Sequence, residues 1–185
     1  MLTTTALDGE YTLADWEAMP DDGRRYELIG GTITVSPPPV PDHQIASVNL
    51  EQLLLAAVPP GHVMLHAPIG LRLPGEQMVQ PDIVVVPRSS IGPKCLTPPV
   101  LLVVEVVSPG SRTHDRVTKR AAYAAAGIEH YWLVDGTAAR RRFTALRLAA
   151  GADGYETALD TTGRVEVTEP LALGFRVSDL FRPPP

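Results

Sequence analysis

The sequence reads DIVVV at residues 82–86 and LLVVEVV at residues 101–107, and these two runs decide the fold. Runs so rich in Val, Ile and Leu are typical of strands that are buried on both faces, as in the middle of a sheet that helices cover. We therefore expect central strands over Val79–Val86 and Val100–Val107. Their composition predicts an α/β domain.

Further elements are expected on both sides of these strands. Helices are predicted over Leu13–Met19 with Thr12 as its cap, from Asp42 to about Ala57, and over about Arg112–Ala126. Strands are predicted over Arg25–Ile29, Thr32–Val35, Val63–Leu73, Tyr131–Val134, Arg140–Leu148, Glu156–Leu159 and Arg164–Val167. The last three are interpreted as a peripheral antiparallel set near the C-terminus. The central order of strand, strand, strand, helix, strand indicates a mixed sheet flanked by helices.

Length and composition bound the architecture. The chain has 185 residues, of which 44% are apolar and 20% charged, enough to build the core of one domain and to exclude wholesale disorder. We expect a flexible N-terminus over residues 1–10, a single domain over 11–181 and a disordered tail over 182–185. A membrane span and a signal peptide are not expected, and the single Cys95 excludes an internal disulfide. These features favour a cytoplasmic location.

The charge is distributed unevenly. The net charge is −5, yet residues 111–148 hold eight basic and three acidic side chains. Such a positive block within an acidic protein argues against non-specific coating of nucleic acid but allows a local phosphate-binding face. The three consecutive arginines at 140–142 are interpreted as a solvated strand edge, and phosphate contact is the lesser alternative. Lys94 and Lys119 are the only lysines among sixteen basic residues, a mild indication that an ammonium group is needed.

Two carboxylates stand in unusually apolar surroundings. Asp82 and Glu105 lie within or beside the two central runs, where an unpaired ionised carboxylate costs on the order of several kcal/mol. A divalent cation is an economical partner for both. Asp115, Lys119 and Tyr123 recur every four residues, so they share one face of the predicted helix, and Lys119 can reach Glu105 if that helix packs on the sheet.

Two carboxylates, a metal ion and an ammonium group form a recurring arrangement for phosphodiester hydrolysis. In that arrangement the metal polarises a phosphoryl oxygen and lowers the pKa of a bound water. The lysine orients the water or neutralises charge in the transition state. The sequence therefore predicts a hydrolytic site built on Asp82, Glu105 and Lys119.

Ordinary structural roles remain open for the same residues. Glu105 could end its strand at a sheet edge and meet solvent. Asp82 could be a turn or strand-start residue. Asp115 and Lys119 could form a surface ion pair, which is the more frequent meaning of that spacing.

Two further residues could belong to the site or lie apart from it. His43 could face the cleft or lie on the surface of the second helix. Glu27, in a predicted strand, could pair with Arg24 or Arg25 or could join the acidic site.

Five segments of the chain, in order and with their spacing, resemble the Uma-type "putative restriction endonuclease" family of the PD-(D/E)XK nuclease superfamily. The segments are RYELIGG at 25–31, QPDIVVV at 80–86, VEVVSP at 104–109, DRVTKRAAY at 115–123 and GIEHYWLVD at 127–135. The resemblance covers about Tyr11 to Phe181. It implies a restriction-endonuclease-like fold and a metal-dependent nuclease site.

The resemblance also implies roles for individual residues. Asp82 would bridge the metal ions, Mg²⁺ or Mn²⁺, with Glu105 and the backbone carbonyl of Val106 as further ligands. The superfamily usually places its lysine two residues after the glutamate, where this chain has Val107, and Lys119 matches the family's alternative position on the following helix.

Supporting and binding residues are predicted as well. Glu27, His43 and Tyr123 are expected to support the site, with Tyr123 beside Lys119. Three arginines of the predicted helix are candidates for phosphate binding: Arg112, Arg116 and Arg120.

A homodimer is expected by analogy with nucleases of the superfamily that pair to cut two strands. An apolar edge near Leu146 and Leu148 is the surface that could support it.

Three functions are compatible with these observations. The first is a Mg²⁺- or Mn²⁺-dependent endonuclease acting on DNA. The second is a catalytically weak or inactive nuclease-like scaffold that binds nucleic acid or a protein partner, which Val107 and the acidic net charge favour. The third is a metal-dependent hydrolase of another phosphoester, such as a nucleotide.

Overall fold

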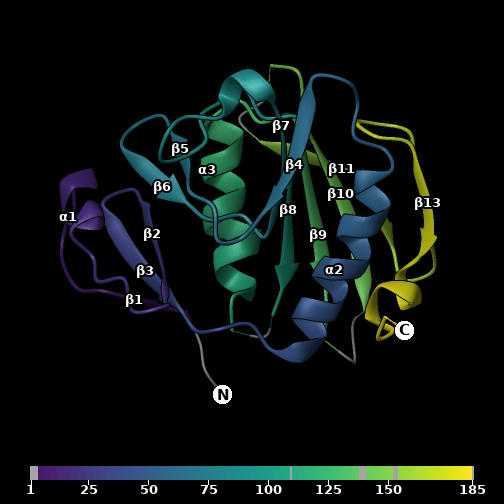
Figure 1. Cartoon of the computed structure of the whole chain (residues 1–185), viewed down its shortest axis with the longest axis horizontal. Helices are drawn as coiled ribbons and strands as arrows, with labels where there is room; N and C mark the ends of the chain where they lie inside the picture. Colours follow the sequence, from purple (N-terminus) through teal and green to yellow (C-terminus); the bar gives the residue numbers. More distant parts are fainter. Residues whose placement is uncertain (1–3, 109, 138–140, 152–153, 185) are drawn as a thin grey trace.

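The central element is a six-stranded mixed sheet in the order β11-β10-β9-β8-β7-β4 (Figure 1). The computed structural model describes residues 4–108, 110–137, 141–151 and 154–184. The strands of this sheet are β4 (His62–His66), β7 (Ile83–Pro87), β8 (Leu102–Val107), β9 (His130–Asp135), β10 (Arg142–Leu148) and β11 (Tyr155–Thr161). Only β8 and β9 are parallel neighbours, and the other four pairs are antiparallel. The mixed sheet predicted from the sequence is confirmed.

Some predicted positions lie outside the residues that the structure describes. They are residues 1–3 of the expected N-terminal segment, Pro109 of one family segment, Arg140 at the start of a predicted strand, and Pro185 of the expected tail.

Two of the predicted strands are in fact divided. The run over Val79–Val86 splits into β6 (Gln77–Val79) and β7, because Pro81 has no N–H for a ladder and Asp82 uses its side chain for long-range contacts. The run over Val63–Leu73 likewise splits into β4 and β5 (Leu71–Leu73), with a cis Ala67–Pro68 bond between them. Each division sends the chain from one sheet to another.

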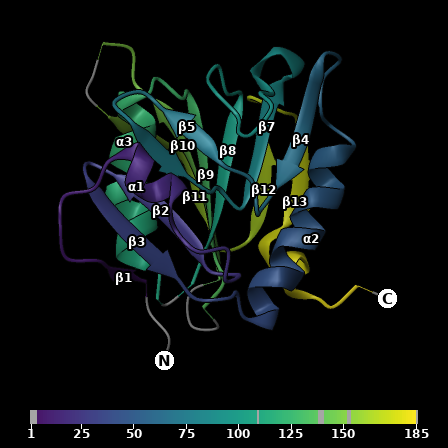
Figure 2. The same ribbon diagram turned by 60° about the vertical axis from the view of Figure 1, so that its left-hand side comes forward.

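Helices cover both faces of the central sheet (Figures 1 and 2). On one face α2 (Pro41–Leu55) packs Leu50 and Leu54 against alternate residues of β7 and β8. It begins at Pro41 rather than with Asp42 as its cap, since proline suits the first helical position and Val40 makes no side-chain capping bond.

The other face carries the predicted third helix in two parts. A π-helical turn, η2 (His114–Lys119), is followed by α3 (Arg120–Ala125). Tyr123 of α3 packs against Val103 and Tyr131 of the sheet. A π-helical turn is rare and often marks a functional site, and this one carries Lys119.

A smaller sheet in the order β1-β3-β2-β6-β5 lies beside α3 (Figure 2). Its strands are β1 (Thr5–Ala6), β2 (Arg25–Ile29), β3 (Thr32–Ser36), β5 and β6. The predicted cap Thr12 forms a capping box with Asp15 at the start of α1 (Leu13–Glu17), which ends two residues earlier than expected. This sheet brings β2, with Glu27, against η2.

The C-terminal region adds a separate antiparallel pair, β12 (Arg164–Val167) and β13 (Leu173–Arg176), and the short helix η3 (Val177–Phe181). A further short helix, η1 (Arg88–Ser90), follows β7. The strands β10 and β11, by contrast, extend the central sheet.

The apolar edge expected near Leu146 and Leu148 is a wrong prediction. Both residues lie in β10, which is paired with β9 on one side and β11 on the other, and Leu146 is buried. The dimer expectation therefore loses the surface that was to support it. Within the described ranges, no helix is both long enough and apolar enough to span a bilayer.

Candidate active site

Strand register brings the two predicted carboxylates together. The antiparallel pairing of β7 with β8 joins Ile83 to Val104, so Asp82, just before β7, lies opposite Glu105. Glu105 sits in the middle of the sheet and is 1% exposed, while Asp82 is 5% exposed. A solvent-facing edge position for Glu105 is excluded. Asp82 does stand at the start of a strand, directly before β7, but it is buried there.

Asp82 is held by three partners from different elements. Arg25 of β2 donates from Nη1 to Oδ1 at 2.6 Å, the Val106 N–H donates to Oδ2 at 2.8 Å, and Nε2 of His43 on α2 lies 3.0 Å from Oδ2. Burial acts to raise the pKa of Asp82, but the His43 and Arg25 contacts outweigh it and hold the pKa well below its usual range. Asp82 is therefore charged at neutral pH.

Lys119 is the buried cation of the site. Its Nζ lies 2.8 Å from Oε1 of Glu27, 2.9 Å from Oε1 of Glu105 and 4.0 Å from Oδ1 of Asp115, with 1% of the residue exposed. Burial acts to lower the pKa of Lys119, but Glu105 and Glu27 raise it above its usual value. A surface ion pair between Asp115 and Lys119 is excluded, because both residues are buried.

The surroundings of Glu27 lower its pKa, whereas those of Glu105 raise its pKa. Burial acts to raise the pKa of Glu27, but Lys119 and His114, whose Nε2 lies 3.1 Å from Oε2, bring it to about 2. At Glu105 burial raises the pKa well above its usual value, against the attraction of Lys119. Carboxyl groups with divergent pKa values can take different roles in acid–base chemistry.

Tyr123 fixes the orientation of Glu105. Its hydroxyl donates to Oε1 at 2.8 Å, the same oxygen that accepts from Lys119. Its own pKa is raised well above the usual value by burial and by the Glu105 charge, so the hydroxyl keeps its proton. The expected support by Tyr123 therefore takes the form of a direct bond to Glu105.

The chain matches one family over nearly all of its length. Residues 13–179 match Uma2, a family whose description reads "Putative restriction endonuclease". The chain belongs to the Uma2 family. A solved structure described as a "putative nuclease belonging to DUF820 from Anabaena variabilis" aligns over 92% of this chain and 97% of its own, with a TM-score of 0.71 and 21% identity. That likeness confirms the expected fold class, and no curated protein shows significant similarity to the chain.

In this Uma2-family chain the predicted site residues fall into two groups. Asp82, Glu105, Lys119, Glu27, His43 and Tyr123 converge in one cluster, hereafter the carboxylate cluster. Arg112, Arg116 and Arg120 line a different cavity, together with residues of β9, β10 and β11.

Two further residues contact the carboxylate cluster but were not predicted as part of the site. Arg25 was considered only as a partner of Glu27, yet it binds Asp82, and His114 binds Glu27 in its place. The alternation of β2 places Arg25 and Glu27 on one face, a signal that could have indicated Arg25. His114 offers no such signal, because it reaches Glu27 through the fold alone.

The donor chemistry of the cluster fits Mg²⁺ or Mn²⁺. Hard cations of this kind prefer carboxylate and carbonyl oxygens, and Mg²⁺ is usually bound through one or two carboxylates while it keeps several waters. Asp82, Glu105 and the Val106 carbonyl are the candidates. Within the part of the chain that the structure describes, no group of three or more His, Cys, Asp or Glu residues is placed to hold a metal.

A cavity with unpaired polar atoms adjoins Asp82. Asp82 opens on a cavity of about 200 Å³ that Arg25, His43 and Ser47 also line. Arg25 Nε, His43 Nδ1 and Ser47 Oγ are buried without a hydrogen-bond partner among the described residues. Buried groups of this kind are normally paired with protein or water, so the cavity is suited to hydrated ligands.

Proposed function

We propose that this Uma2-family protein is a Mg²⁺- or Mn²⁺-dependent endonuclease that hydrolyses phosphodiester bonds of DNA. One observation carries the proposal. The buried ammonium of Lys119 lies 2.9 Å from Glu105, and Glu105 occupies the strand position opposite Asp82. The family description and the fold shared with a nuclease-like protein support the same reaction class.

The metal would be held by Asp82, Glu105 and the backbone carbonyl of Val106. When bound, it would supply a Lewis acid for the phosphoryl oxygen and lower the pKa of a coordinated water. Asp82 suits this role because it keeps its charge at neutral pH. Val107, at the usual lysine position of the superfamily, is part of the core on the α3 face, so the ammonium comes from η2 instead.

The chain's own groups then carry the remaining tasks. Lys119, charged throughout the physiological range, would stabilise the negative charge that develops on the phosphoryl group. Tyr123 keeps Glu105 in place through its 2.8 Å hydrogen bond.

Cleavage assays with two pairs of variants test this function. Purified protein with Mn²⁺ or Mg²⁺ should cut plasmid, single-stranded or branched DNA. Asp82→Asn and Lys119→Met should abolish cleavage, whereas Asp21→Asn and Lys94→Met, at exposed positions, should not. If folded wild-type protein leaves all three substrates intact, or the two site variants cut as well as their controls, the nuclease proposal is wrong.

A nuclease-like scaffold is the second candidate, and one observation favours it. Asp82 already has the Arg25 guanidinium at 2.6 Å as a counter-cation, and Lys119 lies between two further carboxylates. The cluster is thus largely neutralised by its own side chains. Calorimetric titration with Mn²⁺ separates the candidates: heat that Asp82→Asn removes supports the nuclease, whereas no heat, together with unchanged nucleic-acid binding by that variant, supports the scaffold.

We also propose a homodimer, in which each copy cuts one strand. Its basis is the analogy with paired nucleases. Light scattering coupled to size exclusion should give twice the mass of 19.9 kDa, and a monomer at micromolar concentration would contradict it.

A further inference from the structure

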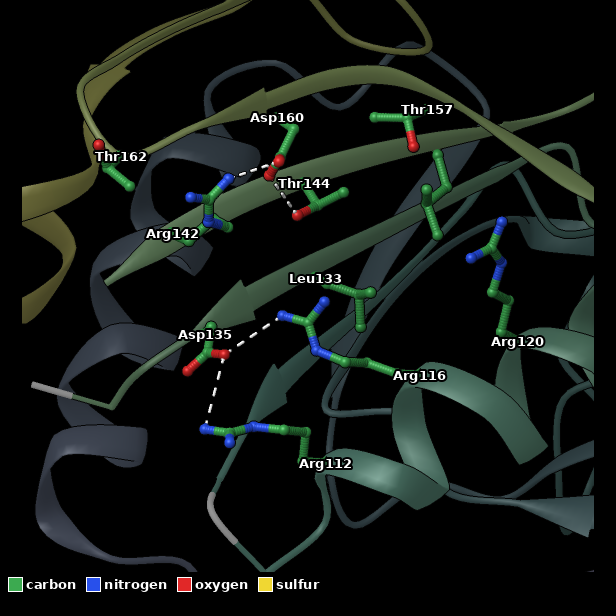
Figure 3. Close-up of a pocket in the computed structure, with 11 residues that line it drawn as sticks. Arg112, Arg116, Arg120, Leu133, Asp135, Arg142, Thr144, Thr157, Asp160 and Thr162 are labelled. Atoms are coloured by element: carbon green, nitrogen blue, oxygen red, sulfur yellow. Dashed lines mark hydrogen bonds and ion pairs between the residues drawn. The ribbon is translucent and has the colours of Figure 1, made fainter. Parts of the chain in front are cut away.

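A second polar cavity lies beside the helical stretch that carries Lys119. It encloses about 530 Å³ and is hereafter the arginine pocket. Figure 3 shows Arg112, Arg116 and Arg120 reaching into it from the helix side, with Arg142 and Asp160 across from them on the strands. A volume of this size is within the usual range for a small-ligand site, about 300–1,000 Å³.

The arginine pocket has a surplus of positive charge. Four guanidinium groups face two carboxylates, Asp135 and Asp160. The surplus of two positive charges occurs in a chain whose net charge is −5. An anionic ligand is the natural complement of such a site.

The two carboxylates position the arginines without using all of their donors. Asp135 is 3% exposed and lies 3.2 Å from Nη2 of Arg116 and 3.9 Å from Nη2 of Arg112, while Arg142 pairs with Asp160. Each guanidinium has five N–H donors in a planar fork. The Nε of Arg112 is buried and has no partner among the described residues. Donors therefore remain for a ligand in the pocket.

The side chains are also accessible. Those of Arg116, Arg112 and Arg142 are 34%, 38% and 40% exposed. Arg120 is held by its Nη2, which donates to the Tyr155 carbonyl at 2.6 Å. Arginine forks held in this way match the geometry of phosphate oxygens.

The helix places this pocket and the carboxylate cluster next to each other. Residues 112, 116 and 120 follow one stripe of the helical stretch, and residues 115, 119 and 123 follow the adjacent stripe. Leu133, which lines the pocket, is the register partner of Glu105 on the neighbouring strand. Adjacent strands are about 4.8 Å apart, so the pocket begins roughly one strand away from the cluster.

A further cavity lies near the start of the helix. Ser108, Gly110 and Ser111 line a cavity together with Arg25 and His43. Arg112, the next residue, lines the arginine pocket. This cavity shares Arg25 and His43 with the cavity at Asp82, and its lining residue Ser111 precedes Arg112 of the arginine pocket. The succession of the three cavities is one that an extended strand, and not a single small anion, could occupy.

We propose that the arginine pocket binds backbone phosphates of a nucleic-acid strand, on the flank of the bond that is cut at the carboxylate cluster. The position of the strand relative to the carboxylate cluster rests on the proposed nuclease function. Phosphate contacts fix the register and orientation of nucleic acid on a protein. The pocket would thus position the strand, and its arginines would take no part in the chemistry.

Binding measurements in EDTA test the pocket separately from catalysis. The probe is a fluorescent single-stranded oligonucleotide, with affinity read by anisotropy. Arg120→Ala and Arg142→Ala should each weaken binding roughly tenfold, the scale of one charge-assisted hydrogen bond. Each should also reduce the slope of log affinity against log salt by about 0.7, the value for one phosphate contact on a single strand.

Arg88→Ala is the matched control, because Arg88 is exposed on η1, at the far end of β7 from Asp82. It removes the same charge and should leave affinity and salt slope near wild type. Thermal unfolding should show that all three variants fold. Equal weakening by all three, or no weakening by the pocket variants, would overturn the proposal, as would a wild-type protein that binds no oligonucleotide.

Competition with inorganic pyrophosphate separates a strand from a free phosphate ester. Pyrophosphate should displace the oligonucleotide from wild type and bind the Arg120→Ala/Arg142→Ala double variant more weakly. If that variant loses pyrophosphate binding but keeps full affinity for the oligonucleotide, the pocket serves small phosphate esters and the strand assignment is wrong. If the protein cuts DNA but its pocket variants bind the oligonucleotide normally, only the inference about the pocket is refuted. If the protein binds the oligonucleotide through the pocket but never cuts DNA, only the proposed nuclease function is refuted.

Discussion

Replacing Lys119 by methionine tests whether its ammonium is the counter-charge of the buried carboxylates. Its Nζ lies 2.8 Å from Glu27 and 2.9 Å from Glu105, in an environment closed to solvent. At an effective dielectric constant of about 20, each close pair contributes ~6 kcal/mol of Coulomb attraction, most of which desolvation offsets. Removing one partner leaves the other charge uncompensated, so Lys119→Met should lower the free energy of unfolding by about 3–5 kcal/mol.

Urea unfolding at pH 7 and pH 5 measures this effect. The loss should be smaller at pH 5, because Glu105 already has a raised pKa and takes up a proton once the ammonium is gone. The double variant Lys119→Met/Glu105→Gln should regain about 1–3 kcal/mol relative to the single variant, the range of coupling between contacting residues. Lys94→Met, at an exposed position, should stay within about 0.5 kcal/mol of wild type. A cost for Lys119→Met as small as that of Lys94→Met, with no coupling to Glu105, would refute the reasoning.

Three further results are expected. The folded-state pKa of Glu27 is about 2, below its unfolded value of 4.5, so Glu27 stabilises the fold by ~3 kcal/mol above pH 4.5. This contribution should disappear as the pH falls toward 2, and the unfolding free energy of Glu27→Gln, measured in urea, should lack that pH-dependent loss. Arg25→Ala should bind Mn²⁺ more tightly than wild type in calorimetric titration, because it removes the counter-cation of Asp82, and weaker binding would instead make Arg25 a residue that positions Asp82. Leu54→Ala, inside the core, should cost about 2–5 kcal/mol, whereas Leu55→Ala, one residue further and exposed, should cost little; equal costs in denaturant melts would contradict the packing of α2.

Much of the central sheet was predictable because burial leaves a strong signal in composition. The runs around Ile83 and Val104 can be so apolar only where both faces are covered, and they became β7 and β8. The ends of the strands were less predictable, because Pro81 divides an apolar run whose composition alone indicates one continuous strand. The π-helical turn of η2 has no recognisable pattern, because it depends on how the helix meets the sheet.

The carboxylate cluster was predictable where its residues are costly to bury. Asp82 and Glu105 stand out for that reason, and Lys119 lies at the helical spacing that brings it to them. Arg25 and His114 could not be placed in the same way, because their partners lie 57 and 87 residues away in the sequence. Their positions depend on the smaller sheet, whose packing against η2 follows from tertiary structure.

The most direct test of the central claim is a crystal of the protein soaked in Mn²⁺, with anomalous scattering used to locate the ion. The account predicts a peak between the carboxylates of Asp82 and Glu105, within bonding distance of the Val106 carbonyl, with the Lys119 ammonium still beside Glu105. A well-ordered crystal with no peak at those oxygens, or with manganese bound only elsewhere on the molecule, would contradict it.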